Sequence, residues 1–195
     1  FIYALAFERG IATPETLLDD SRRRYDDGYD PHNFSRRFSG RVTAREALVR
    51  SLNTPAVDLL ERVGTSECIG RLRALGLRRV RRSADHYGLS LGLGGVEVSL
   101  LELVEAYATI GRLGRRRALS FSEKTSPEAT RQVLSPEAAL AVARILCDVP
   151  FGEVGSAESS ELDLPCMAAK TGTSFGLRDA WTAVSYTHLR AHETE

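Results

Sequence analysis

Three helix-start signals constrain the fold of this chain more than any other feature. In 43–46 (Thr-Ala-Arg-Glu) and 99–102 (Ser-Leu-Leu-Glu), a hydroxyl residue precedes a glutamate by three positions, the capping-box pattern of a helix N-terminus. Ser135 is followed by proline and glutamate and then by an apolar run to about Cys147, which also indicates a helix start. We therefore expect helices to follow all three signals, the first to about Ser51.

Weaker patterns fill the rest of the chain. Residues 1–7 are apolar and end before Gly10, as expected for the end of a buried helix. Further helices are predicted at 54–63, with Pro55 at the first position, and at 66–75. Residues 19–41 indicate a loop with short strands, 89–98 a turn with a short extended piece, and 131–134 a short strand.

A β-hairpin is predicted near the C-terminal end. The apolar residues 165–169 lead into Lys170-Thr171-Gly172-Thr173-Ser174, and a second apolar strand occupies 179–184. Helices followed by an antiparallel pair of strands favour the α+β class, with helices packed on an antiparallel sheet.

Composition excludes several kinds of partner. The 195 residues carry 26 basic and 26 acidic side chains, and this balance implies no nucleic-acid or polyanion partner. No stretch reaches the ~20 apolar residues of a membrane span. The three cysteines, Cys68, Cys147 and Cys166, permit one disulfide at most and match no metal spacing. We predict neither a metal nor a cofactor, and His188 and His192 are not expected to form a zinc site.

Lys170 is one of only two lysines among the 26 basic residues, so arginine supplies the routine positive charge. A compact, titratable ammonium can anchor a carboxylate or help to move a proton. Gly172 leaves room for a substrate backbone at the strand edge, where an extended peptide can add as a further strand. The alternative is a lysine that merely flanks a hairpin turn.

Ser51 and Asn53 lie two residues apart in the break between two predicted helices. A hydroxyl can relay a proton and an amide can hold a substrate amide, so an interhelical turn that presents both can serve a cleft. The alternative is that Asn53 or Thr54 simply caps the next helix, which is the commonest use of these residue types.

Ser-x-Asn followed by Lys-Thr-Gly resembles the second and third active-site motifs of the penicillin-binding proteins. The stretches 29–34 (Tyr-Asp-Pro-His-Asn-Phe), 40–48, 51–57 and 91–98 resemble the transpeptidase domain of the bifunctional, class A members, and the 1C group most. The resemblance covers about 1–184. It implies a β-lactamase/transpeptidase-like fold, of which this chain would lack both ends.

The resemblance also implies roles for single residues. Lys170 would bind the terminal carboxylate of the substrate and assist proton transfer, Ser51 would pass a proton to the leaving amine, and Asn53 would hold an acyl side-chain amide. Thr171 and Thr173 would bind the carboxylate, and the N–H of Thr173 would form half of the oxyanion hole. Gly172 and Ser174 complete the expected substrate-binding stretch, whereas Asp179 and Trp181 are read as structural.

The nucleophilic serine of the family belongs to a Ser-x-x-Lys motif, which we expect just before Phe1. The implied activity is peptidoglycan D,D-transpeptidation with penicillin binding, on D-Ala-D-Ala stem peptides, at the periplasmic face of the bacterial inner membrane. The parent protein would add a glycosyltransferase domain and a membrane anchor, and this piece alone would be inactive. A β-lactamase or D,D-carboxypeptidase, and a non-catalytic peptidoglycan- or β-lactam-binding module, remain the alternatives.

The two ends of the chain complete the domain prediction. Residues 1–184 are expected to form a partial transpeptidase domain that ends before the strand after the hairpin. Residues 185–195 change character and lack strand alternation, so we read them as a non-native tail.

Overall fold

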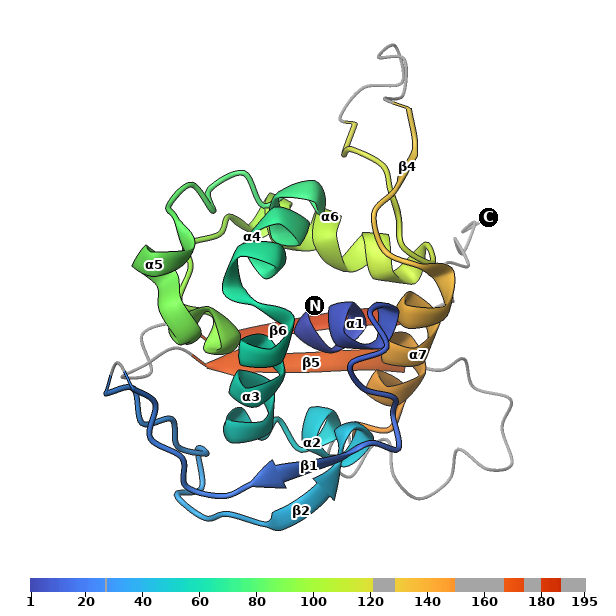
Figure 1. The fold of residues 1–195 in the computed structure, drawn as a ribbon. Helices are drawn as coiled ribbons and strands as arrows, with labels where there is room; N and C mark the ends of the chain where they lie inside the picture. Colours follow the sequence, from blue (N-terminus) through green and yellow to red (C-terminus); the bar gives the residue numbers. More distant parts are fainter. Residues whose placement is uncertain (27, 121–128, 150–166, 174–179, 187–195) are drawn as a thin grey trace, which may run out of the picture.

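The computed structural model describes residues 1–26, 28–120, 129–149, 167–173 and 180–186 (Figure 1). Its helices are α1 (Ile2–Glu8), α2 (Ala44–Val49), α3 (Asn53–Val63), α4 (Thr65–Ala74), α5 (Ala84–Tyr87), the 3₁₀ helix η1 (Gly88–Leu93), α6 (Leu100–Gly111) and α7 (Pro136–Cys147). Its strands are β1 (Leu17–Asp20), β2 (Gly40–Thr43), β3 (Arg115–Arg116), β4 (Arg131–Gln132), β5 (Met167–Thr173) and β6 (Ala180–Tyr186). They form three antiparallel pairs, β1–β2, β3–β4 and β5–β6.

All three helix-start signals are confirmed. The hydroxyl of Thr43 accepts the backbone N–H of Glu46 at 3.1 Å, and the Glu46 carboxylate accepts the N–H of Thr43 at 2.7 Å. Ser99 makes the same reciprocal pair at the start of α6. Ser135 caps α7 by accepting the N–H of Ala138 at 3.1 Å. These caps satisfy N–H groups that have no partner inside their own helix.

The segment 88–93 is helical, so the expected turn and extended piece are wrong there. Leu91 is buried in the core. A Cβ on Gly92 would stand only 3.4 Å from the Leu60 side chain and 3.5 Å from Val57. The segment therefore packs directly against α3, and this burial selects the compact helical form over an extended one.

The predicted hairpin is confirmed, with Lys170 opposite Ala183 and Gly172 opposite Trp181. Strand β6 continues past Val184, because Ser185 pairs with Ala168 and Tyr186 with Met167. The first two residues of the proposed tail are thus part of the hairpin. The remainder, 187–195 with His188 and His192, lies outside the described residues, and its non-native origin stays a prediction.

One hydrophobic core joins the helices to the hairpin. Helix α1 crosses the centre of the molecule between α3 and α7, the β5–β6 hairpin packs against α6 and α7, and β1–β2 lies at the opposite edge (Figure 1). The largest fully buried side chains include Leu5, Leu59, Leu60, Leu134 and Ile145. The α+β class is confirmed. No helix among the described residues is long and apolar enough to cross a bilayer.

The cysteines agree with the limit of one disulfide. Cys147 is disulfide-bonded, and Cys68 is a free thiol buried in the core. Burial raises the pKa of Cys68 to about 11, which makes it an unreactive packing residue rather than a nucleophile.

Candidate functional site

Lys170 and Ser51 meet in space although 119 residues separate them in the chain. The ammonium of Lys170, on β5, donates a hydrogen bond to the hydroxyl oxygen of Ser51, in the turn between α2 and α3. It also donates to the backbone carbonyl of Thr171 at 2.6 Å. The structure therefore places two of the three predicted catalytic residues in direct contact.

Ser51 holds a backbone conformation that helix-capping geometry normally assigns to glycine. Helix α2 ends with the N–H of Leu52 bonded to the carbonyl of Ala47 at 2.9 Å and the N–H of Ser51 bonded to the carbonyl of Leu48 at 3.2 Å. This pair of bonds defines a Schellman motif, whose left-handed residue is usually glycine. Ser51 takes that place with φ of 53°. A serine kept at a strained position points to a use for its hydroxyl.

Asn53 is the first residue of α3 and not its cap. The N-cap is Leu52, which has no side-chain hydrogen bond to offer. The amide nitrogen of Asn53 donates to the carbonyl of His32 at 2.7 Å, and its backbone N–H donates to the Asn33 side-chain oxygen at 2.7 Å. The Thr54 hydroxyl donates to Asp20. The alternative that Asn53 or Thr54 caps the helix is therefore wrong, as is the expected position of Pro55 at the helix start.

The side-chain oxygen of Asn53 has no hydrogen-bond partner among the described residues. The bond to His32 fixes the side-chain nitrogen, so this oxygen remains as an acceptor beside the Ser51 turn. An amide held in this way can receive an N–H from a ligand.

Partial burial changes the pKa of Lys170. It lowers the pKa of Lys170 below the ordinary lysine value of 10.5, because a charged ammonium loses hydration when it leaves water. Burial also lowers the pKa of the Phe1 ammonium, Cys68 acts in the opposite direction, and the charge of Lys170 lowers it further. The amino end of α1 is therefore close enough to Lys170 for the two charges to interact.

The β5 strand presents Thr171, Gly172 and Thr173 beside an edge that has no strand partner among the described residues. Thr171, Gly172 and Thr173 are exposed, and a Cβ on Gly172 would meet no atom within 4 Å. Within the described ranges β5 pairs only with β6, so its other edge has backbone groups for a further strand. Ser174 and Asp179 lie outside the described residues, and Trp181 is 39% exposed on β6.

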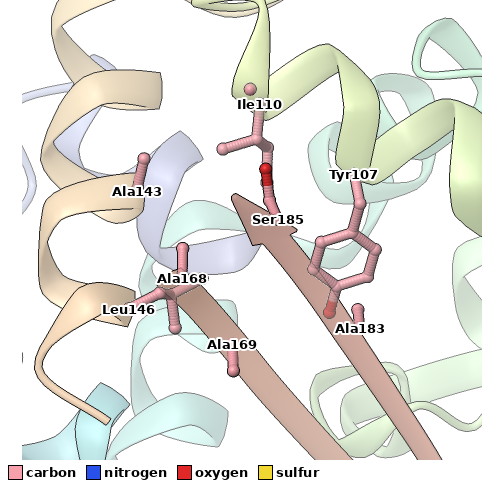
Figure 2. Close-up of a pocket in the computed structure, with 9 residues that line it drawn as sticks. Tyr107, Ile110, Ala143, Leu146, Ala168, Ala169, Ala183 and Ser185 are labelled. Carbon is pink, nitrogen blue, oxygen red and sulfur yellow. The ribbon is translucent and has the colours of Figure 1, made fainter. Parts of the chain in front are cut away.

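A small cavity behind this hairpin is not the site. It has a volume of about 30 Å³ and lies where Tyr107 and Ile110 of α6 face Ala183 and Ser185 of β6, with Leu146 of α7 at its side (Figure 2). It has room for about one water molecule, whereas ligand pockets usually enclose ~300 Å³ or more. In the part of the chain that the structure covers, no group of three or more His, Cys, Asp or Glu side chains is placed to hold a metal.

Comparison with known protein families decides the classification. The family model described as "Penicillin binding protein transpeptidase domain" matches residues 1–180. The chain belongs to this family. Among curated penicillin-binding proteins, 1C of Escherichia coli K12 is 38% identical over 182 residues, 93% of this chain and 23% of that protein. Penicillin-binding protein 1A of Aquifex aeolicus is 32% identical over 195 residues, covering 92% of this chain and 26% of that protein. The resemblance to the 1C group is thus confirmed.

Solved penicillin-binding proteins share the fold. Penicillin-binding protein 1A of Haemophilus influenzae superposes with a TM-score of 0.80 at 22% identity, covering 94% of this chain and 34% of that one. Penicillin-binding protein A of M. tuberculosis, solved as an imipenem acyl-enzyme complex, superposes at 0.71 with 21% identity, covering 95% of this chain and 49% of that one. The chain spans about a quarter of the length of the curated penicillin-binding proteins described above.

Sequence reasoning missed the residues that hold the Ser51–Asn53 turn of this transpeptidase domain. His32 and Asn33 belong to the family-like stretch 29–34 but carry no local pattern that predicts a role, and neither does Asp20. Their partners lie 20 to 34 residues away in the chain. The only available signal was the concentration of polar residues in 29–34 just before the α2–α3 pair.

Proposed function

We propose that this chain is part of a peptidoglycan D,D-transpeptidase that cross-links stem peptides ending in D-Ala-D-Ala and is acylated by penicillin. The contact between Lys170 and Ser51 carries the proposal. It joins a titratable ammonium to a hydroxyl beside a strand edge. Acyl transfer to and from a peptide requires both groups that can move a proton and a place for the extended peptide to bind. Membership of the transpeptidase family supports the same reaction class.

In the proposed reaction, a peptide adds along the free edge of β5 and its terminal carboxylate pairs with Lys170. Thr171 and Thr173 bind that carboxylate, and the N–H of Thr173 stabilises the oxyanion. A nucleophilic serine forms a bond to the carbonyl carbon of the penultimate D-Ala while the bond to the terminal D-Ala nitrogen breaks. The serine proton reaches the departing amine through Ser51. An amine of a neighbouring stem then takes the acyl group, and the serine hydroxyl is restored.

The amino end of α1 is where this nucleophile would be supplied. Phe1 lies close enough to Lys170 for an electrostatic interaction, and Lys170 contacts Ser51. Residues that continue α1 upstream of Phe1 would therefore enter the same small region. A Ser-x-x-Lys motif there would place a serine and a second lysine near Lys170 and Ser51. The acyl-enzyme of the M. tuberculosis relative shows such chemistry in a protein of this fold.

The parent protein would add a glycosyltransferase domain and a membrane anchor and would act at the periplasmic face of a bacterial inner membrane. The bifunctional relatives, of which this chain spans about a quarter, support that arrangement. The shared short motifs also fit a β-lactamase or D,D-carboxypeptidase, but the longer likeness over 26–57 and 88–108 favours a transpeptidase of the synthase type. The coding sequence upstream of Phe1 would distinguish a non-catalytic binding module, because an intact Ser-x-x-Lys motif there supports an enzyme.

Labelling with a fluorescent penicillin tests the proposal. We expect no covalent, heat-stable labelling of the 195-residue chain, and stoichiometric labelling of a chain continued upstream of Phe1 by its own coding sequence. Lys170→Ala in the longer chain should lower the second-order acylation constant roughly 10²–10³-fold, the usual cost of losing one pre-organised electrostatic contact.

Arg45→Ala is the matched control, since Arg45 makes an exposed ion pair with Asp148 that includes neither Ser51 nor a residue of β5 or β6. It should acylate at the wild-type rate. Specific labelling of the 195-residue chain, blocked by excess unlabelled penicillin, would contradict the assignment of the nucleophile. A longer chain that is folded but never labelled would contradict the proposed function itself.

A further inference from the structure

Asp20 is a fully buried carboxylate at the end of β1, with 0% of its surface exposed. One of its oxygens accepts hydrogen bonds from the Asn33 amide at 2.7 Å and from the Thr54 hydroxyl. The other accepts the backbone N–H of Ser39 at 2.8 Å. A buried charge is tolerated only when it is satisfied in this way, so Asp20 is the centre of a polar network that joins three separate segments.

Asn33 connects this network to the candidate site. Its nitrogen donates to Asp20 and, at 2.9 Å, to the carbonyl of Arg37. Its oxygen accepts the N–H of Asn53 at 2.7 Å. Because Leu52 offers no cap of its own, Asn33 caps α3 from 20 residues earlier in the chain, while Thr54 ties the same turn of helix to Asp20.

The α3 end of the Ser51–Asn53 turn is thereby held from outside. The turn begins at the strained end of α2, with Ser51 at positive φ. Its other end is the first turn of α3, which is bound by Asn33 and Asp20 and by the His32 carbonyl. A turn with one strained residue keeps a single geometry only when neighbouring contacts over-determine it.

We propose that Asp20, Asn33 and Thr54 are positioning residues that hold the Ser51–Asn53 turn in register with Lys170 of β5. The inference builds on the proposed function, because its consequence for rate matters only if the pair takes part in acyl transfer. Asp20 itself touches neither Lys170 nor Ser51 among its described contacts. It acts through the first turn of α3.

Asp20 suits this task because it remains charged. Burial on its own raises the pKa of the carboxyl, but the hydrogen bonds from Thr54, Asn33 and Ser39 outweigh it, so the pKa lies below the ordinary value of 3.8. Hydrogen bonds to a charged acceptor are roughly twice as strong as neutral ones. The carboxylate thus gives the turn a stiffer anchor than a neutral amide would.

Lysine NMR of the 195-residue chain tests the placement without any need for activity. The chain has two lysines, Lys124 and Lys170, so ¹³Cε-lysine labelling gives two signals that Lys170→Arg assigns. We expect Lys170 to titrate below 10.5 in the wild type. In Asp20→Asn and Asn33→Ala the turn loosens, Lys170 gains water, and its titration midpoint moves up toward 10.5.

Thr54→Val covers the case in which the other changes unfold the chain, since it removes one hydroxyl and keeps the shape. It should raise the Lys170 midpoint as well, and Thr54→Ser, which keeps the hydroxyl, should not. Asp19→Asn is the matched control, because Asp19 is exposed on the opposite face of β1. Folded variants with an unchanged Lys170 midpoint would overturn the inference. So would unfolding of every network variant, because the network would then hold the fold rather than the turn.

Acylation of the upstream-extended chain supplies the second readout. Displacement of a reacting group by about 1 Å can cost ~10²-fold in rate, so Asp20→Asn should slow acylation by a factor of that order and Asp19→Asn should not. If the network variants shift the Lys170 midpoint but the wild-type extended chain is never acylated, the proposed function is refuted and the positioning stands. If folded Asp20→Asn is acylated as fast as the wild type, the positioning alone is refuted.

Discussion

At the scale of single residues, Ser51 shows a conflict between stability and use. The Schellman end of α2 calls for a residue at positive φ, where glycine has no Cβ to clash, yet the chain places a serine there with φ of 53°. The hydroxyl that glycine would lack is the one bonded to Lys170. The local backbone thus gives up stability for a side chain that only the distant β5 strand can explain.

Two substitutions of Ser51 separate the strain from the hydrogen bond. Ser51→Gly and Ser51→Ala both remove the hydroxyl, but only glycine relieves the left-handed backbone, which costs an L-residue roughly 1–2 kcal/mol. Glycine offsets ~0.5–1 kcal/mol of this gain, because it loses more conformational entropy on folding than alanine does. We expect the glycine variant to be more stable than the alanine variant by about 0.5–1 kcal/mol in urea unfolding. Equal stabilities would mean that the strain at Ser51 does not exceed the chain-entropy cost of glycine, contrary to the expectation.

At the scale of elements, α3 depends on a segment that is not part of it. Its N-cap residue, Leu52, makes no side-chain bond, and Asn33 supplies the missing acceptor from the loop between β1 and β2. Helices α2 and α6, by contrast, are capped by their own N-cap side chains. The start of α3 is therefore fixed by a tertiary contact, and α3 is also the helix that presents Asn53.

The charge of Asp20 should make the fold sensitive to acid. Its pKa is depressed in the folded state, so its contribution is complete above its unfolded value of about 3.8 and is lost as pH falls through the folded pKa. The titratable side chain that faces it is Tyr3 of α1, which is uncharged in this range. At pH 7 Asp20→Asn should cost about 1.5–3 kcal/mol, as expected for bonds to a charged group.

Urea unfolding of wild type and Asp20→Asn at pH 7 and near pH 3 measures this contribution. The difference in unfolding free energy between the two proteins should shrink on acidification, since below about pH 3.8 unfolding of the wild type takes up a proton at Asp20 that the variant cannot bind. A difference that stays constant with pH would mean that Asp20 is neutral in the folded protein.

At the scale of the whole molecule, one core supports both halves of the site. Helix α3 carries the Ser51–Asn53 turn at its start and packs against α1 and η1, and the hairpin with Lys170 packs against α6 and α7 (Figure 1). Both sets of helices meet in the same cluster of buried residues. The approach of Ser51 to Lys170 therefore depends on the packing of this core as well as on the polar network around Asp20.

Leu60→Ala tests this dependence. Leu60 is fully buried on α3 beneath Gly92 of η1, and a buried leucine truncated to alanine typically costs ~2–5 kcal/mol. Leu140→Ala, at a position on α7 that is 37% exposed, should change the unfolding free energy by less than about 1 kcal/mol. Chemical denaturation of both variants is the measurement. Similar losses for the two would argue against a single cooperative core.

The sequence by itself determined the features whose signals are local. The boxes at Thr43 and Ser99 and the cap at Ser135 started helices where expected, because a cap bonds within three residues of itself. The hairpin with Lys170 was also predictable from its apolar runs. The order of the Ser-x-Asn and Lys-Thr-Gly motifs indicated the family. The individual roles of Ser51, Asn53, Lys170 and the Thr171–Ser174 stretch remain predictions that labelling and acylation must test.

Only the tertiary structure decided how these pieces combine. The helical form of 88–93 depends on burial of Leu91, the true start of α3 on Asn33, and the Ser51–Lys170 contact on the packing of two segments 119 residues apart. Each of these results from contacts between residues distant in the chain, for which neither residue carries a local pattern. Hydrophobic burial and the need to satisfy the Asp20 carboxylate selected them.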